Sequence, residues 1–484
     1  MLTANKKERE EMVRVRFAPS PTGYIHLGNV RTALFNYLFA KRQGGKFILR
    51  VEDTDIERSK PEYRAGLLED LRWMGIEWNE GPEVGGEFGP YLQSERLDIY
   101  KKYTQKLLEE GKAYYCYVTE EETEESKRLA RLEKRPPRFD NRGRNFSKDE
   151  IEARKARGIK PTIRFKVENP KVSMTDMVRG DVHFNLDEMV GDFVIVRADG
   201  NPTFHLAVCI DDGLMGVTHV IRGEDHLSNT PKHILLLEAM GFKPPIYGHL
   251  SLIFGPGGEP LSKRLGDVSV REFRKKGYLP EGLCNYIAML GWAPGDNKEI
   301  FTWAELQQVF SMERVNKSSS IYDPHKLDWV NGEHLRALKP EEFVAKAFKW
   351  LKDNFQIHHD ENLVKQILPV FQDNIERFDL LPEKLAILND DLHYEAKDQL
   401  QSEDGKEICR VALELLPSVT GEGEAMYENF VNALKPKVKA KGKHLFMPLR
   451  IALTGKAHGP ELKRIFPVLG IKKVQLRFEK ASNV

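Results

Sequence analysis

Residues able to bind a nucleotide gather in one short loop, residues 17–29. A β-rich segment precedes this loop at 13–16, and two prolines and a glycine inside the loop force a turn. A helical pattern begins after Gly28, so the loop opens onto a helix N-terminus, where free N–H groups favour anions. His26 can donate a hydrogen bond to phosphate oxygens, and Gly28 lets a nucleotide approach the backbone. The loop therefore predicts a site for a nucleotide phosphate.

The elements expected to position this loop form one βαβ unit. Apolar residues between 30 and 38 recur at helical spacing, and two glycines at 44–45 mark the end of that helix. A second strand is expected over 47–51. Because parallel strands end at the same edge of a sheet, ligands are expected at the carboxyl ends of these strands.

A second set of α/β signals follows a long intervening segment. The apolar run at 193–196 is expected to be a buried strand at which the parallel sheet resumes, and 217–222 is expected to be another. Thr230 and Pro231 predict the start of a helix that ends at Gly241. The fold expected is an α/β protein: a split Rossmann-like doubly wound parallel sheet with an inserted α+β domain and an all-helical C-terminal third.

Residues 26–29, His-Leu-Gly-Asn, resemble the first signature of the class I aminoacyl-tRNA synthetases, usually His-Ile-Gly-His. A bare His-x-Gly is common by chance, but the whole string 16–29 in a strand–turn–helix setting, followed by residues 50–55, resembles the glutamyl/glutaminyl branch of that family. Residues 261–264, Leu-Ser-Lys-Arg, resemble the second signature, Lys-Met-Ser-Lys-Ser. The helical C-terminal third is similar to the bacterial glutamyl type, because the glutaminyl type reads the anticodon with β-barrels.

The resemblance implies an ATP site in which His26 and Lys263 are catalytic. Negative charge moves onto the departing pyrophosphate, and these side chains can stabilise it without acting as nucleophiles. Pro260 replaces the first lysine of the second signature, which leaves Lys263 as the main cation. The remaining ATP-binding residues that the resemblance implies are Gly28, Asp225, Ile253, Ser262 and Arg264.

A glutamate site must hold two carboxylates and one ammonium group, so it needs guanidinium donors and an acidic partner. The resemblance implies Arg16 for the side-chain carboxylate, Glu52 for the ammonium group and Arg222 as a further arginine. Without the family, an edge-strand arginine and a surface ion pair would be the better interpretations of Arg16 and Glu52. The other implied glutamate-site residues are Ala18, Ser20, Phe204 and Val208, and Phe204 stands where the family usually has tyrosine.

The resemblance also implies six segments. These are the first half of the catalytic domain at 1–112, an inserted acceptor-stem-binding domain at 113–190, the second half at 191–255, a signature-loop and stem-contact domain at 256–338, and helical anticodon-binding domains at 339–400 and 401–484. Some relatives carry zinc in the insertion. Here Cys116 lacks the second thiol of a Cys-x-Cys pair, so no zinc and no other protein-held metal is expected.

Two basic regions and one arginine are candidates for contact with RNA. Within 119–158 stand Arg128, Arg131, Lys134, Arg135, Arg138, Arg142 and Arg144, and five lysines lie within 435–443. On sequence alone each region is as consistent with a solvated surface as with phosphate contact. The resemblance shifts the first region towards RNA, whereas the second stays open. Arg377 aligns with an arginine that helps related enzymes exclude tRNA(Gln), which predicts a tRNA contact there.

Composition limits the class of protein. A chain of 484 residues with 40% hydrophobic and 30% charged residues is expected to form several domains, and a net charge of +1 means that any RNA surface must be local. Four scattered cysteines and the lack of an apolar run of membrane length or a signal peptide predict a cytoplasmic protein with no membrane partner. Monomer is the family default.

The function predicted is ligation of L-glutamate to tRNA(Glu) through glutamyl-adenylate, using ATP with Mg²⁺ on its phosphates. Three alternatives are a non-discriminating enzyme that also charges tRNA(Gln), a smaller type of enzyme that glutamylates a modified tRNA base, and a catalytically silent tRNA-binding paralogue. The smaller enzymes lack the helical C-terminal third, and the presence of His26, Gly28 and Lys263 argues against silence.

Overall fold

The computed structural model describes residues 12–55, 57–259, 261 and 268–484. The chain forms two compact units. One comprises Met1–Arg271 with Cys284–Asp323, and the other comprises Glu272–Leu283 with Pro324–Val484. Among the residues described, none of the helices is both long and apolar enough to cross a bilayer.

The first unit contains a four-stranded parallel sheet in the order β2-β1-β8-β9. Its strands are β1 (Arg14–Phe17), β2 (Lys46–Leu49), β8 (His219–Gly223) and β9 (Ile246–Leu250). Helix α1 (Leu27–Arg42) connects β1 to β2, and α8 (Thr230–Met240) connects β8 to β9. Because β8 pairs beside β1, two segments about two hundred residues apart in sequence end at the same edge of the sheet.

Local signals explain where these helices begin and end. His26, in extended conformation, is the N-cap of α1, and Gly44 adopts a positive φ of 61° after the last turn. Helix α8 begins at Thr230 with proline in its first turn and ends at Gly241, whose φ of 85° is left-handed. The predicted βαβ unit and the predicted helix at 230–241 are confirmed.

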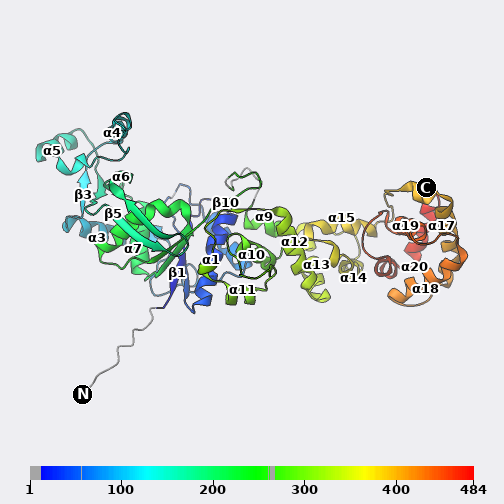
Figure 1. Cartoon of the computed structure of the whole chain (residues 1–484). Coiled ribbons are helices and arrows are strands. Elements are labelled where there is room, and N and C mark those ends of the chain that lie inside the picture. Colours follow the sequence, from blue (N-terminus) through cyan, green and yellow to red (C-terminus); the bar gives the residue numbers. More distant parts are fainter. Residues whose placement is uncertain (1–11, 56, 260, 262–267) are drawn as a thin grey trace, which may run out of the picture. The chain divides into compact units, whose positions relative to one another are not determined.

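Between the two halves of the parallel sheet lies an α+β segment. Figure 1 shows its strand β3 (Ala113–Cys116) and helices α4 (Glu120–Leu132) and α5 (Lys148–Ala156) in cyan. Strand β3 pairs antiparallel with β4 (Thr162–Phe165). A hairpin of β5 (Lys171–Asp176) and β6 (Gly180–Asn185) follows, with its two strands paired antiparallel.

One strand prediction is wrong. Strand β7 (Phe193–Val196) is buried as expected, but it pairs antiparallel with β4 and does not belong to the parallel sheet. The parallel sheet resumes only at β8. An apolar run shows that a strand is buried, but it carries no information on which strand it pairs with.

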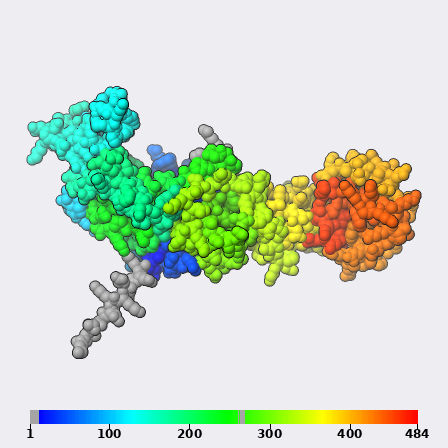
Figure 2. Space-filling model, in the orientation of Figure 1, coloured from blue at the N-terminus to red at the C-terminus, as the bar shows by residue number. Residues whose placement is uncertain are grey.

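The second unit is helical. Residues 324–484, all of which the structure describes, contain helices and loops without a β-strand. Figure 2 shows the last part of this unit, in orange to red, as one packed body. The longer helices are α12 (Pro324–Ala337), α13 (Pro340–Asn354), α14 (Glu361–Phe371), α17 (Glu403–Leu415), α18 (Glu424–Leu434), α19 (Lys443–Thr454) and α20 (Leu462–Ala481). Their apolar faces share one hydrophobic core, which includes Phe343, Phe371, Phe430 and Phe466.

Candidate active site

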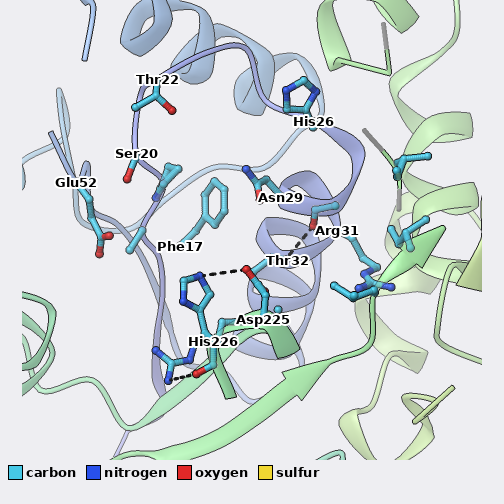
Figure 3. Close-up of a pocket in the computed structure, with 18 of the residues that line it drawn as sticks. Phe17, Ser20, Thr22, His26, Asn29, Arg31, Thr32, Glu52, Asp225 and His226 are labelled. Carbon is cyan, nitrogen blue, oxygen red and sulfur yellow. Dashed lines mark hydrogen bonds and ion pairs between the residues drawn. The ribbon is translucent and has the colours of Figure 1, made fainter. Parts of the chain in front are cut away.

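A cavity of about 760 Å³ opens at the carboxyl ends of β1 and β8. Figure 3 shows His26 on one side of it, Asp225 and His226 on the opposite side, and Glu52 at a third. Its lining comes from the loop after β1, the first turns of α1, the segment after β2, the start of α7 (Phe204–Leu214), the end of β8 and residues 251–253. The cavity therefore lies at the edge where a parallel sheet is expected to bind its ligand.

The cavity brings together ten of the residues that the sequence singled out: Arg16, Ala18, Ser20, His26, Gly28, Glu52, Phe204, Arg222, Asp225 and Ile253. Val208 lies on α7 but is buried, at 1% exposed, and is not among the described lining residues. Pro260, Ser262, Lys263 and Arg264 lie outside the described residues. Leu261 and Val268, which flank residues 262–267 in the sequence, both line the cavity.

The start of α1 faces the cavity. The His26 side chain forms no capping hydrogen bond, and no acidic residue occupies the first turn of the helix. Gly28, Asn29 and Thr32 from the same turns also line the cavity. Backbone N–H groups and the helix dipole therefore favour an anion at this end, as the sequence predicted.

A buried charge network lies beneath the cavity. Arg16 donates from Nε to Asp212 Oδ1 at 3.2 Å, and Arg50 donates from Nη1 to the same oxygen at 2.7 Å. Arg50 also donates from Nη2 to Glu52 Oε1 at 3.3 Å. Burial raises the pKa of Glu52 to about 7, although Arg50 and Arg16 act in the opposite direction. Glu52 is therefore poised to change its charge near neutral pH.

The two acidic residues of α7 were not singled out from the sequence. Asp211 is fully buried and accepts hydrogen bonds from Arg96 Nε at 2.7 Å and from Tyr100 Oη at 2.9 Å. Asp212 shares its carboxylate between Arg16 and Arg50. Adjacent carboxylates in an otherwise apolar helix were an available signal, because buried charges need partners.

Phe204 packs its ring against histidines. Its centroid lies 5.6 Å from that of His226 and 5.7 Å from that of His233. Arg222, at the end of β8, is 5% exposed and donates to His233, His249, Thr230 and the His226 carbonyl. The phenyl ring has no hydroxyl to donate, so the polar lining on this side comes from Arg222, Asp225 and His226.

Comparison with known proteins decides the family. Residues 12–329 match the family described as tRNA synthetases class I (E and Q), catalytic domain, and residues 342–482 match the family described as anticodon binding domain. The chain belongs to the class I tRNA synthetases of the E and Q group.

Similarity to members of this synthetase family extends over nearly the whole chain. The chain is 45% identical to the glutamate–tRNA ligase of Carboxydothermus hydrogenoformans, and the match covers 98% of this chain and 100% of the relative. It is 46% identical to the glutamate–tRNA ligase of a Sulfurihydrogenibium species, covering 97% and 99%. The crystal structure of a glutamate tRNA ligase from Elizabethkingia meningosepticum, in complex with its amino acid, matches with a TM-score of 0.86 at 32% identity, covering 98% and 100%.

The inserted segment of this synthetase pairs most of its basic side chains internally. Five of the basic residues singled out above form ion pairs with nearby carboxylates: Arg128, Arg135, Arg138, Arg142 and Arg144. The partner of Arg144 is Asp192, whose side chain is fully buried. These pairs favour a structural role for Arg144, whereas RNA contact by the exposed members stays a prediction.

Cys116 is buried in a small apolar cluster with Val118 and Phe139. Throughout the described part of the chain, no three or more His, Cys, Asp or Glu side chains are grouped so as to hold a metal ion. The thiol thus contributes to packing in this synthetase.

In the helical unit the Arg377 guanidinium is held by two carboxylates. Nη1 lies 2.7 Å from Asp328 Oδ2, and Nε lies 2.9 Å from Asp379 Oδ1. The hydrogen bonds and charges of these two aspartates raise the Arg377 pKa despite burial, which acts against it. The five lysines of 435–443 are all exposed, while Val438 and Ala440 between them are buried. Contact with tRNA by Arg377 and by this lysine row stays a prediction.

Proposed function

We propose that this chain joins L-glutamate to tRNA(Glu) in two ATP-dependent steps. The α-carboxylate of glutamate attacks the α-phosphate of ATP, which gives glutamyl-adenylate and pyrophosphate. A ribose hydroxyl of the terminal adenosine of the tRNA then takes the glutamyl group and releases AMP. Family membership, and relatives named glutamate–tRNA ligases that match over nearly their whole length, support this activity.

The observation that carries the proposal is the charge balance of the cavity. Arg16 and Arg222 both line it. Arg16 pairs with Asp212, which it shares with Arg50, and among the described residues no carboxylate forms an ion pair with Arg222. Glu52 supplies the acidic group nearby. Such a lining suits a ligand with two carboxylates and one ammonium group, because each charge then meets an opposite one in a partly buried site.

We assign the glutamate contacts accordingly. The Arg16 and Arg222 guanidinium groups donate hydrogen bonds to the carboxylate oxygens of glutamate, and the Glu52 carboxylate accepts hydrogen bonds from its ammonium group. Ala18, Ser20 and Phe204 form the floor and wall of the same site. Support for this assignment is that all of them line one cavity, at the end of the sheet where ligands bind.

We assign the nucleotide to the α1 side of the cavity. His26 and Gly28 lie at the helix start, and Asp225 and Ile253 line the same space, where ribose and base would fit. The proposed ATP site also includes Ser262, Lys263 and Arg264, which lie outside the described residues. Mg²⁺ is proposed to enter as a part of MgATP, because phosphate oxygens and water supply the ligands that it prefers.

Glutamate-dependent pyrophosphate exchange into ATP, measured with and without tRNA(Glu), tests the activity. We expect exchange with glutamate when tRNA is present and little with glutamine. His26→Ala should reduce kcat, whereas the matched variant His358→Ala, at an exposed histidine of the helical unit, should leave it unchanged. A purified wild-type chain that gives no exchange under either condition would be a silent paralogue, and the proposal would be wrong.

A further inference from the structure

Arg222 is a buried cation whose partners are mostly uncharged. It donates from Nε to His249 Nε2 at 3.3 Å, from Nη1 to His233 Nδ1 at 3.2 Å, and from Nη2 to Thr230 Oγ1 at 2.8 Å and to the His226 carbonyl at 3.3 Å. These are four acceptors for five N–H groups. Among the residues described, no carboxylate forms an ion pair with it. Burial lowers the pKa of Arg222.

The tautomer of His249 follows from Asp176. His249 Nδ1 lies 2.6 Å from Asp176 Oδ2, and both side chains are fully buried. Burial works against the charge of Asp176, but hydrogen bonds from His249 and from the backbone N–H groups of Arg179 and Val178 outweigh it and lower the Asp176 pKa. An ionised carboxylate can only accept, so Nδ1 carries the proton and Nε2 has a lone pair for Arg222.

The fold places this acceptor directly beside Arg222. Arg222 in β8 and His249 in β9 are register partners in the parallel sheet. Asp176 is the last residue of β5, in the hairpin that interrupts the catalytic domain. The hairpin therefore acts on Arg222 through one imidazole.

A second imidazole holds the other side of the guanidinium. Because Arg222 has no acceptor, His233 Nδ1 must accept, and His233 Nε2 then donates to His205 Nδ1 at 3.1 Å. Burial, reinforced by nearby cations, lowers the pKa of His233 well below its usual value and that of His205 to about 3. Both rings are therefore neutral at neutral pH, and neither adds a charge beside Arg222.

We propose that Asp176, His249 and His233 are positioning residues that hold Arg222 in place by neutral acceptors, so that its positive charge is left for an anionic substrate group. This rests on the proposed function. A guanidinium already paired to a protein carboxylate would attract a substrate anion less strongly. Left unpaired in a buried site, the Arg222 charge is compensated only when a substrate carboxylate arrives, so the arrangement favours binding of a carboxylate there.

Asp176→Asn tests the inference with little change of shape. The Asn oxygen can still accept the backbone N–H groups, but its NH₂ would face His249 Nδ1 and force the proton onto Nε2, where it would confront the donor of Arg222. In pyrophosphate exchange with tRNA present, we expect KM for glutamate to rise about tenfold and KM for ATP to change less than about twofold. Asp181→Asn, at an exposed carboxylate of the same hairpin, is the matched control.

A second pair keeps the inference testable if Asp176→Asn fails to fold. His233→Asn retains an oxygen near the position of Nδ1 and should keep the wild-type KM for glutamate within about threefold, whereas His233→Leu should raise it about tenfold. Three results would overturn this inference while leaving the proposed function intact. They are equal rises in the KM for glutamate and for ATP in Asp176→Asn, an unchanged KM for glutamate in Asp176→Asn, and equal effects of His233→Leu and His233→Asn. An inactive wild type would overturn the proposed function and this inference with it.

Discussion

The ionisation of Glu52 predicts how the affinity for glutamate depends on pH. In the proposed assignment Glu52 receives the α-ammonium group of glutamate, and only its charged carboxylate would attract that group. Burial raises the Glu52 pKa to about 7 from the ordinary 4.5, and the opposing effects of Arg50 and Arg16 do not cancel this shift. Near neutral pH the site is therefore a mixture of a competent ionised form and an incompetent neutral form.

The size of the effect follows from the fraction ionised. With a pKa of about 7, roughly a tenth of Glu52 is charged at pH 6 and roughly nine-tenths at pH 8. The apparent affinity scales with the competent fraction, so KM for glutamate should fall about tenfold between those pH values. Most of the change should lie between pH 6 and 7.5, because the ionised fraction saturates above that.

The direction of the pH dependence distinguishes an effect on glutamate binding from an effect on the stability of the fold. Because folding raises the Glu52 pKa, the contribution of Glu52 to the free energy of unfolding is greatest below about pH 4.5 and is lost as pH rises through about 7. Between pH 6 and 8, Glu52 therefore makes the fold slightly less stable while glutamate binds better. A fall in KM with rising pH cannot come from improved folding at this residue.

The assay is glutamate-dependent pyrophosphate exchange with tRNA present, at constant ionic strength and at several pH values from 6 to 8. Glu52→Gln should bind glutamate weakly and give a KM that no longer varies with pH, since its amide does not titrate. KM for ATP, measured in parallel, controls for general effects of pH. A flat KM for glutamate in the wild type, or the same slope in Glu52→Gln, would refute the reasoning.

Three further predictions concern other parts of the chain. His26→Ala should lower kcat of exchange on the order of 10²-fold with little change in KM for glutamate, because the lost donor acts on phosphate charge; an equal loss in His358→Ala would contradict this. Arg144→Ala should lower the free energy of unfolding by about 3 kcal/mol in denaturant titration, because it removes the ion-pair partner of the buried Asp192 and leaves that carboxylate only its hydrogen bonds from Tyr114 and the Val167 N–H; an unchanged midpoint would contradict that. Arg377→Gln should lower the melting temperature by several degrees and raise charging of tRNA(Gln) relative to tRNA(Glu); if the wild type already charges both equally, the discriminating role is wrong.

The loop at 17–29 and the helices that begin at Leu27 and Thr230 could be predicted from the sequence because their causes are local. A proline or glycine restricts the backbone at its own position, and apolar spacing within two turns gives the helix its buried face. His26 and Gly28 follow from this loop itself, whereas the resemblance added the other candidate residues one at a time, and ten of the whole set line one cavity.

What the tertiary structure decided is which side chains meet. Strand β7 was predicted as a strand, but its partner β4 lies about thirty residues away and could not be inferred from an apolar run. Asp212 meets Arg16 across 196 positions, and Asp176 meets His249 across 73. Propensity acts over a few neighbouring residues, whereas the state of a buried charge depends on whatever the packed elements bring within hydrogen-bond distance. The charge of Glu52 and the neutral partners of Arg222 therefore follow from the fold rather than from any local pattern.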